Sequence, residues 1–266
     1  MGVSIQEDLF NVRDTRVVVT GAASGLGFAM AEVMSDCGAR VTLADVDAER
    51  LEEATSRLGG QVRSAQVDVS DPDQVERLFA GVVEEQGGVD VVFANAGISL
   101  EPGVVDQEGG FGAFDRGRWD RVLGVNLNGV VFTMQAAAER MKRQGSGRIV
   151  VTASTAGLRP DPLVGYSYSA TKFAAVGLVR QAALELAPHG VHVNAIAPGP
   201  FHTRIGGDTE IPDSVWESVV ALGRMAEPEE LKPVALLLGS PASSFMTGAV
   251  VTVDGGQMLL SPRPQA

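Results

Sequence analysis

Seven short apolar runs, rich in β-branched residues, alternate along the chain with longer segments of helical periodicity. The runs span residues 16–20, 40–45, 62–69, 90–97, 147–154, 191–198 and 249–256. This alternation is typical of βαβ units, in which a crossover helix follows each strand. Because the runs are apolar almost throughout, we expect helices to cover both faces of each strand. The sequence therefore predicts an α/β fold with one doubly wound parallel sheet of about seven strands.

The segments between these runs predict one domain with two loop-rich insertions. A chain of 266 residues can form a single core, and α/β domains of this length usually stay undivided. A long helical segment at 118–144 ends at a Gly-Ser-Gly triplet. The stretches 99–117 and 198–228 instead combine glycine with polar turn formers, which favours functional loops. We therefore predict a single domain over 1–266, with a lid over the substrate at about 200–226.

Charge and composition narrow the possible partners. The formal net charge of −12 and the lack of a basic run disfavour nucleic acid and membrane surfaces. The opening stretch MGVSIQEDLF carries acids where a signal peptide carries basic and then apolar residues. The single Cys37 cannot form an intrachain disulfide, which is compatible with a reducing compartment. We expect a cytoplasmic protein, and the turn between His189 and His192 disfavours a metal site.

The stretch TGAASGLG follows the first apolar run and leads into a helical segment. Gly21, Gly25 and Gly27 allow a sharp turn in which the backbone approaches a pyrophosphate at the helix N-terminus. A glycine triplet alone also fits an ordinary tight turn between a strand and a helix. The succession of strand, glycine turn, helix and a second strand ending at Asp45 favours a Rossmann-type dinucleotide site instead.

Asp45, at the end of the second run, predicts which dinucleotide binds. A carboxylate at this place accepts hydrogen bonds from both ribose hydroxyls of an adenosine moiety. The 2′-phosphate of NADP would meet a like charge there, and Ser24 supplies no compensating cation. The alternative is that Asp45 is a solvated turn residue. We expect NAD as the cofactor.

Over essentially its whole length the chain resembles a classical short-chain dehydrogenase/reductase. TGAASGLG is similar to the cofactor turn of that family, and NAG at 95–97 is similar to its sheet-stabilising motif. DV at 68–69 resembles its adenine-flanking pair, and PGPFHT at 198–203 resembles its nicotinamide segment. The resemblance implies that Asn95 mainly stabilises the central sheet and that Thr203 meets the nicotinamide carboxamide. The cofactor contacts that it implies are Gly21, Ser24, Gly25, Leu26, Gly27, Asp45, Asp68, Val69, Asn95, Ala96, Gly97, Tyr168, Lys172, Pro198, Gly199 and Thr203.

Both tyrosines of the chain and one of its three lysines lie in the stretch GYSYSATKFA. Residues four apart share a helix face, so Tyr168 neighbours Lys172, whereas Tyr166 has Ala170 at that spacing. An ammonium beside the phenol would lower its pKa and let its hydroxyl exchange a proton with a substrate. A Tyr-Lys pair also fits surface packing, but Y-x-x-x-K is the catalytic motif of the family. We predict Tyr168 as the acid/base, with Tyr166 either lining the pocket or packing.

The resemblance adds Ser154 and Asn126 to the catalytic set. Ser154 would hydrogen-bond the substrate oxygen beside Tyr168, and Asn126 would hold a water that connects Lys172 to solvent. From the residues alone, a serine at a strand end is weak evidence, and an asparagine in a helix can repair backbone hydrogen bonding. Ser154 lies 14 residues before Tyr168, one more than the commonest family spacing, which we attribute to a larger loop at 157–165.

The resemblance implies an NAD-dependent alcohol dehydrogenase or ketoreductase that interconverts a secondary alcohol and a ketone by hydride transfer. Three alternatives stay open: a 3-oxoacyl-thioester (acyl carrier protein) reductase with the same catalytic residues, a non-catalytic nucleotide-sensing protein, and a structural subunit. The family also leads us to expect a homotetramer that pairs the long helix at 118–144 across two-fold axes. Arg159, His202 and Arg204 lie near enough to meet a polar substrate, but each also fits a structural or solvent-facing role.

Overall fold

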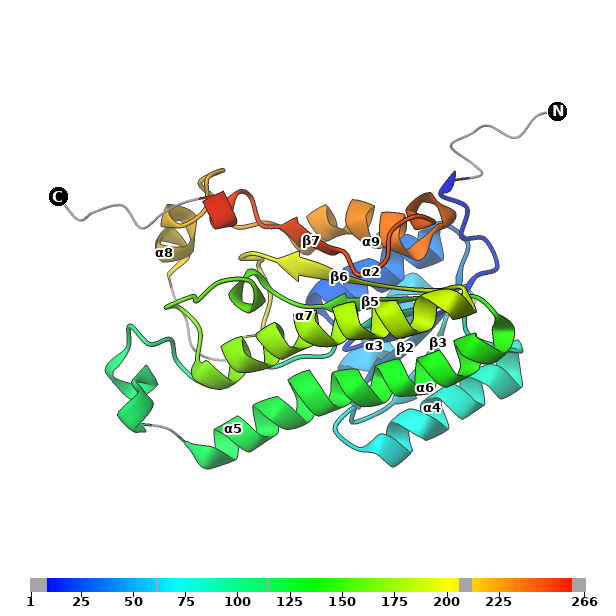
Figure 1. Cartoon of the computed structure of the whole chain (residues 1–266), viewed down its shortest axis with the longest axis horizontal. Helices are drawn as coiled ribbons and strands as arrows, with labels where there is room; N and C mark the ends of the chain where they lie inside the picture. Colours follow the sequence, from blue (N-terminus) through cyan, green and yellow to red (C-terminus); the bar gives the residue numbers. More distant parts are fainter. Residues whose placement is uncertain (1–8, 61, 114, 206–211, 260–266) are drawn as a thin grey trace.

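The computed structural model describes residues 9–60, 62–113, 115–205 and 212–259. Parallel strands form one sheet in the order β3-β2-β1-β4-β5-β6-β7 (Figure 1). The strands are β1 (Arg16–Thr20), β2 (Arg40–Asp45), β3 (Arg63–Gln66), β4 (Val91–Ala94), β5 (Gly147–Thr152), β6 (Val191–Pro198) and β7 (Val250–Val253). The predicted doubly wound fold is confirmed, because the chain crosses from β3 past β1 to β4 and so reverses the direction in which strands are added.

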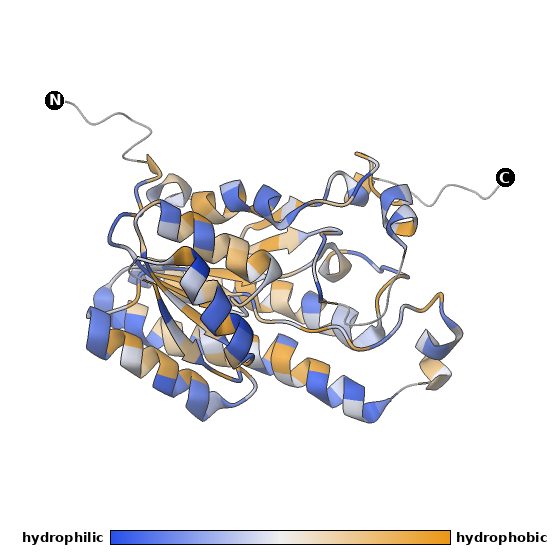
Figure 2. Cartoon of the chain, turned by 180° about the vertical axis from the view of Figure 1, so that it is seen from behind, coloured by the Kyte–Doolittle hydropathy of each residue, from blue (hydrophilic) through white to orange (hydrophobic). Residues whose placement is uncertain are grey.

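Two helix layers cover the sheet. The helices are α2 (Gly25–Asp36), α3 (Ala48–Leu58), α4 (Pro72–Gln86), α5 (Arg116–Leu123), α6 (Gly129–Gln144), α7 (Tyr166–Leu186), α8 (Asp213–Ser218) and α9 (Lys232–Gly239). One core cluster joins the strands to α4, α6 and α7, and a second joins them to α2, α3 and α9. Figure 2 shows hydrophobic residues concentrated along the strands and hydrophilic residues on the outer turns of the helices. The sheet is therefore buried from both sides, as parallel sheets require.

The edges of the sheet are less covered than the sequence predicts. Val17, Val18 and Val19 of the central β1 are inaccessible to solvent, and β4 is buried throughout. In β3, by contrast, three of the four residues are exposed, and β7 is mostly half-buried. The expectation that every strand is covered on both faces is wrong for β3, which lies at the edge of the sheet where the helix layers cover less of it.

The predicted long helix contains a π-helical segment. α5 continues through η3 (Gly124–Asn128) into α6, with right-handed helical backbone angles at both junctions. A π-helical turn inserts an extra residue into the hydrogen-bond ladder, and such turns are frequent at functional sites. The helix ends as predicted at Gly145, whose φ of 71° lies in the left-handed region that glycine tolerates.

The two predicted insertions follow β4 and β6, at the carboxyl edge of the sheet. The first contains two short 3₁₀ turns, η1 (Gln107–Gly109) and η2 (Phe111–Ala113). The second is closed at its base by a β-bridge between Phe201 and Ala226, and it carries α8. Residues 206–211 of the predicted lid at 200–226 lie outside the described residues, so the lid stays a prediction. Within the described ranges, no helix has the length and apolar character needed to cross a membrane.

Candidate active site

A cavity of about 940 Å³ lies at the carboxyl ends of the strands, where open α/β sheets bind their ligands. Segments 98–103, 161–164 and 198–205 contribute to its wall together with the glycine turn. All the predicted site residues except Asn126 line it: Gly21, Ser24, Gly25, Leu26, Gly27, Asp45, Asp68, Val69, Asn95, Ala96, Gly97, Ser154, Tyr168, Lys172, Pro198, Gly199 and Thr203. The structure thus brings together motifs that the sequence separates by up to 182 residues, from Gly21 to Thr203.

The backbone of the glycine turn disfavours a side chain at all three of its glycines, and Gly25 has a φ of +54°. A Cβ atom on Gly27 would collide with the carbonyl oxygen of Gly21, and Gly21 itself has a φ of +65°. Gly25 begins α2, and a Cβ there would lie 3.4 Å from the methyl group of Thr203. Ser24 makes no side-chain capping bond, so the first amide groups of α2 keep their N–H donors for a ligand. This cradle fits a pyrophosphate.

Asp45 lies at the end of the cavity where the sequence predicts the adenosine moiety. Its carboxylate accepts hydrogen bonds from the amide nitrogens of Ala23 at 3.0 Å and Asp47 at 3.1 Å. A carboxylate offers about four acceptor positions, so this anchoring leaves room for two ribose hydroxyls. The structure also places Arg50 in the lining, where it pairs with Asp47 at 3.4 Å. The sequence argument that no cation compensates the charge of Asp45 therefore overlooked Arg50, which comes five residues later on α3.

Asn95 connects three strands of the sheet beneath the cofactor cradle. Its amide nitrogen donates to the carbonyl oxygens of Thr20 and Gly21 at the end of β1. Its amide oxygen accepts from the hydroxyl of Thr152 in β5, at 2.9 Å. These bonds agree with the sheet-stabilising role that the resemblance implies for Asn95.

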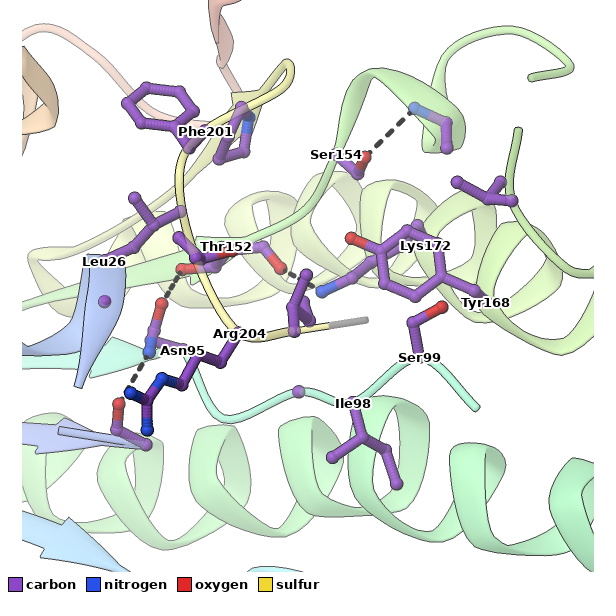
Figure 3. A pocket seen from close by; sticks show the side chains of 18 of the residues that line it. Leu26, Asn95, Ile98, Ser99, Thr152, Ser154, Tyr168, Lys172, Phe201 and Arg204 are labelled. Atoms are coloured by element: carbon purple, nitrogen blue, oxygen red, sulfur yellow. Dashed lines mark hydrogen bonds between the residues drawn. The ribbon is translucent and has the colours of Figure 1, made fainter. Parts of the chain in front are cut away.

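The catalytic candidates meet at the start of α7. Tyr168 and Lys172 lie one turn apart on the buried face of this helix, with exposed fractions of 9% and 1%. Ser154 follows β5, and its hydroxyl accepts a hydrogen bond from the amide of Ala156 at 3.1 Å. Lys172 Nζ donates to the carbonyl oxygen of Thr152 at 2.8 Å and lies 5.5 Å from the centre of the Tyr168 ring (Figure 3). The serine, tyrosine and lysine therefore form one cluster.

Burial dominates the electrostatics of this cluster. It raises the pKa of the Tyr168 phenol above its ordinary value; the Ser154 hydroxyl acts in the opposite direction, and the negative charge of Asp161 adds to the rise. Burial also lowers the pKa of Lys172 to about 8. The expectation that Lys172 gives Tyr168 a low pKa is wrong for this structure, because desolvation disfavours the charged form of both groups.

Asn126 is the one predicted site residue that does not line the cavity. It is fully buried in the π-helical segment η3. Its amide oxygen accepts from the amide nitrogen of Ile98 and its amide nitrogen donates to the carbonyl oxygen of Ile98, both at 2.8 Å. A Cβ on the neighbouring Gly97 would lie 3.5 Å from this amide oxygen and 3.6 Å from Lys172 Nζ. Asn126 thus fixes the loop after β4 beside Lys172.

Tyr166 packs outside the cavity, which resolves the choice that the sequence left open. Its ring meets that of Phe111 edge to face, with ring centres 5.0 Å apart. Tyr166 is 37% exposed, and it does not line the cavity. It attaches the first insertion to the outer face of α7.

Glu101 is a site residue that the sequence reasoning missed. Its carboxylate accepts hydrogen bonds from the amide nitrogen of Ser167 at 3.0 Å and from the Ser167 hydroxyl at 2.6 Å. The N-cap residue of α7 is Gly165, which has no side chain to cap the helix, so Glu101 caps it from the first insertion. A Cβ on Gly165 would collide with Glu101. No local motif marks this pair, because 66 residues separate its members.

Gln257, near the C-terminal end of the described chain, is a second missed residue. It is 2% exposed and lies in η8 (Gln257–Leu259), where its amide oxygen accepts from the hydroxyl of Thr155 at 2.8 Å. Its amide nitrogen donates to Asp161 at 3.3 Å, and its carbonyl oxygen accepts from Arg159 at 2.7 Å. Gln257 therefore connects the end of the chain to the loop that follows Ser154.

The three polar residues left open by the sequence take different places. Arg159 binds the backbone of Gln257 and does not line the cavity. His202 and Arg204 do line it, and both are exposed. Only these two are placed to meet a ligand.

Comparisons with known proteins agree with this geometry. The family model described as enoyl-(acyl carrier protein) reductase matches residues 21–258. The chain is 37% identical to meso-2,3-butanediol dehydrogenase from Serratia marcescens, over 94% of this chain and 96% of that protein. It is 34% identical to a 3-oxoacyl-(acyl-carrier-protein) reductase from Thermotoga maritima, over 91% of this chain and 97% of that protein.

A solved structure extends the likeness to three dimensions. A short-chain type dehydrogenase/reductase from Mycobacterium marinum is 34% identical, with a TM-score of 0.90, and the match covers 97% of this chain and 100% of that chain. The chain therefore belongs to the short-chain dehydrogenase/reductase family, whose oxidoreductases use a nicotinamide cofactor, NAD or NADP.

Proposed function

We propose that the chain is an NAD-dependent alcohol dehydrogenase/ketoreductase that interconverts a secondary alcohol and a ketone. The observation that carries this proposal is the convergence of Ser154, Tyr168 and Lys172 on one cavity with the glycine turn. The names of the relatives support small alcohols as substrates, since one of them is a dehydrogenase of meso-2,3-butanediol.

The residues divide the chemistry between them. In the oxidative direction Ser154 and Tyr168 hold the carbinol oxygen, the hydroxyl proton passes to the Tyr168 oxygen, and a hydride leaves the carbinol carbon as the ketone forms. The bound nicotinamide supplies the hydride acceptor at C4 and, when oxidised, a positive charge. A positive charge near Tyr168 and Lys172 favours the phenolate that must accept the proton. Asn126 holds the loop at Ile98 beside Lys172, where a proton path to solvent would pass.

The preference for NAD rests on Asp45. Its carboxylate is anchored by two backbone amides and lines the adenosine end of the cavity. The opposing cation, Arg50, is about half exposed and already paired with Asp47, which weakens its attraction for a 2′-phosphate.

A panel of secondary alcohols, offered with NAD and with NADP and followed at the absorbance of the reduced nicotinamide, tests the proposal. We expect turnover with NAD. Reduction of 3-oxoacyl thioesters without turnover of simple alcohols would favour the second candidate, which the Thermotoga maritima relative suggests. The net charge of −12 argues against it, since an acidic carrier protein docks on a basic surface. Cofactor binding without any turnover would point to a nucleotide sensor.

We further propose that the protein is a homotetramer. Exposed apolar residues on the outer faces of α6 and α7 support this, namely Val131, Phe173 and Leu184. These two helices run side by side on the same face of the sheet (Figure 1). Light scattering that reports a stable monomer at micromolar concentration would contradict it.

A further inference from the structure

The substrate end of the cavity combines apolar walls with a few polar side chains. Its apolar lining includes Leu163, Val164, Trp216 and Met225. Asp161 lies on the same wall, in the loop between β5 and α7, and lines the cavity together with Ser154 and Tyr168. Asp161 is half-buried, so hydrogen bonds must replace the part of its hydration that the wall removes. The partners of Asp161 therefore decide what this wall can bind.

Asp161 is held in place through both of its carboxylate oxygens. Oδ1 accepts from the amide nitrogen of Leu163 at 3.0 Å, and Oδ2 accepts from the side-chain nitrogen of Gln257 at 3.3 Å. Since a carboxylate has about four acceptor positions, these two bonds leave each oxygen able to accept another donor. The carboxylate is thus oriented but not saturated.

The same network fixes Asp161 relative to the catalytic serine. Gln257 is buried and also accepts from the hydroxyl of Thr155, which directly follows Ser154. One rigid amide therefore holds the carboxylate and the loop that carries Ser154. The negative charge of Asp161 also acts on the pKa of Tyr168, which agrees with its place near the reacting atoms.

We propose that Asp161 binds a second hydrogen-bond donor of the substrate, a hydroxyl or an ammonium group close to the carbinol carbon. The inference rests on the proposed function, because it needs Ser154 and Tyr168 to hold the carbinol oxygen. Diols and amino alcohols then bind better than simple secondary alcohols, because their second donor fills an open acceptor position of this half-buried carboxylate. A 3-oxoacyl thioester has no such donor on the carbons beside its reacting carbonyl.

The test compares butan-2-ol, butane-2,3-diol and 3-aminobutan-2-ol as substrates with NAD. We expect kcat/KM for the diol or the amino alcohol to exceed that for butan-2-ol by about 10- to 100-fold in the wild type. Asp161→Ala should reduce this preference to about twofold or less for the diol, the factor that its two equivalent carbinols supply. Asp161→Asn keeps an acceptor oxygen without the charge, so it should retain part of the preference for the diol and lose that for the amino alcohol.

Asp213→Asn is the matched control. Asp213 lines the same cavity from α8, so its substitution removes one charge from the cavity without touching the Gln257 network. The substrate preference should survive this change. Equal kcat/KM for all three compounds in the wild type, or an unchanged preference in Asp161→Ala that still binds NADH, would overturn the inference.

Failure of the proposed function can be told apart from failure of this inference. If none of the three alcohols is oxidised, the proposed alcohol dehydrogenase is wrong. The same compounds are then titrated calorimetrically into the protein with NAD present. Binding of the diol or the amino alcohol that is lost in Asp161→Ala would support the donor site, and binding that does not depend on Asp161 would refute it.

Discussion

The two halves of the cavity are built in different ways. The cofactor half, where we propose that the dinucleotide binds, rests on strand ends and the turns that follow them, and backbone groups around Gly27, Asn95 and Asp45 fix its geometry. The substrate half, where we propose that the alcohol binds, consists of loops held through side chains such as Glu101 and Gln257. A ligand common to a whole family can be bound by geometry that the backbone fixes. Loops held by side chains let the substrate pocket differ between proteins that share the same sheet.

Tyr168 lies where the two halves meet, and its loss should have the largest effect. Tyr168→Phe removes only the oxygen that exchanges the proton, so we expect kcat to fall by roughly 10²- to 10⁴-fold while the Kd for NADH stays unchanged. Steady-state kinetics and a fluorescence titration with NADH measure the two quantities.

Tyr166→Phe is the matched control, since the same hydroxyl is removed two positions away, outside the cavity. Its activity should stay within about twofold of the wild type. A dead Tyr166→Phe beside an active Tyr168→Phe would reverse the assignment.

In the cofactor half, Asp45 should determine the choice between NAD and NADP. We expect the wild type to prefer NAD by about 100-fold or more in kcat/KM, because a 2′-phosphate meets a like charge in a partly desolvated site. Asp45→Ala should weaken the use of NAD, and Asp45→Ala with Ser24→Arg should favour NADP, since the new guanidinium can pair with the phosphate.

Arg50→Ala tests whether the negative charge of Asp45 or the positive charge of Arg50 decides the choice of cofactor. If Asp45 dominates, this variant keeps its preference for NAD. A wild type that prefers NADP and loses this preference in Arg50→Ala would instead make Arg50 the deciding residue.

Lys172 should make the free energy of unfolding depend on pH, and a variant without this lysine should lose that dependence. Its pKa is about 8 in the folded protein, against an ordinary value of 10.5. Between these two pH values Lys172 binds a proton in the unfolded chain but not in the folded protein, so the free energy of unfolding rises with pH. Below pH 8 the full penalty for the buried charge is present. Urea unfolding should therefore show that the stability of the wild type relative to Lys172→Met improves by about 2–3 kcal/mol from pH 7 to pH 10. A difference independent of pH would contradict the lowered pKa of Lys172.

Glu101 offers a smaller test in the substrate half. Glu101→Ala removes the cap of α7 beside Tyr168, so we expect kcat to fall about 5- to 10-fold without a change in the Kd for NADH. Glu101→Gln keeps an acceptor oxygen for Ser167 and should retain most of the activity. Loss of NADH binding in Glu101→Ala would show that the two halves of the cavity are coupled.

This contrast also explains what the sequence could predict. The strands, the glycine turn and the pair Tyr168 and Lys172 follow from local patterns, and the structure contains them. Glu101 and Gln257 could not be found in this way, because their partners lie 66 and 102 residues away and no spacing rule links them. The pKa of Tyr168 was misjudged for a related reason, since helix spacing identifies a charged neighbour but not the depth at which the pair is buried.

The π-helical segment at Gly124–Asn128 rotates the side-chain faces of α6 relative to those of α5 within one continuous helix. α5 packs against α7, whereas α6 packs mainly against α4 and also against α7, and the extra residue between α5 and α6 offsets their faces by about 100°. Deleting a single residue within the segment would restore a uniform screw and turn one half of the helix away from its partner. An insertion or deletion within this helix would therefore shift which side chains face the neighbouring helices, whereas the same change in a surface loop would not.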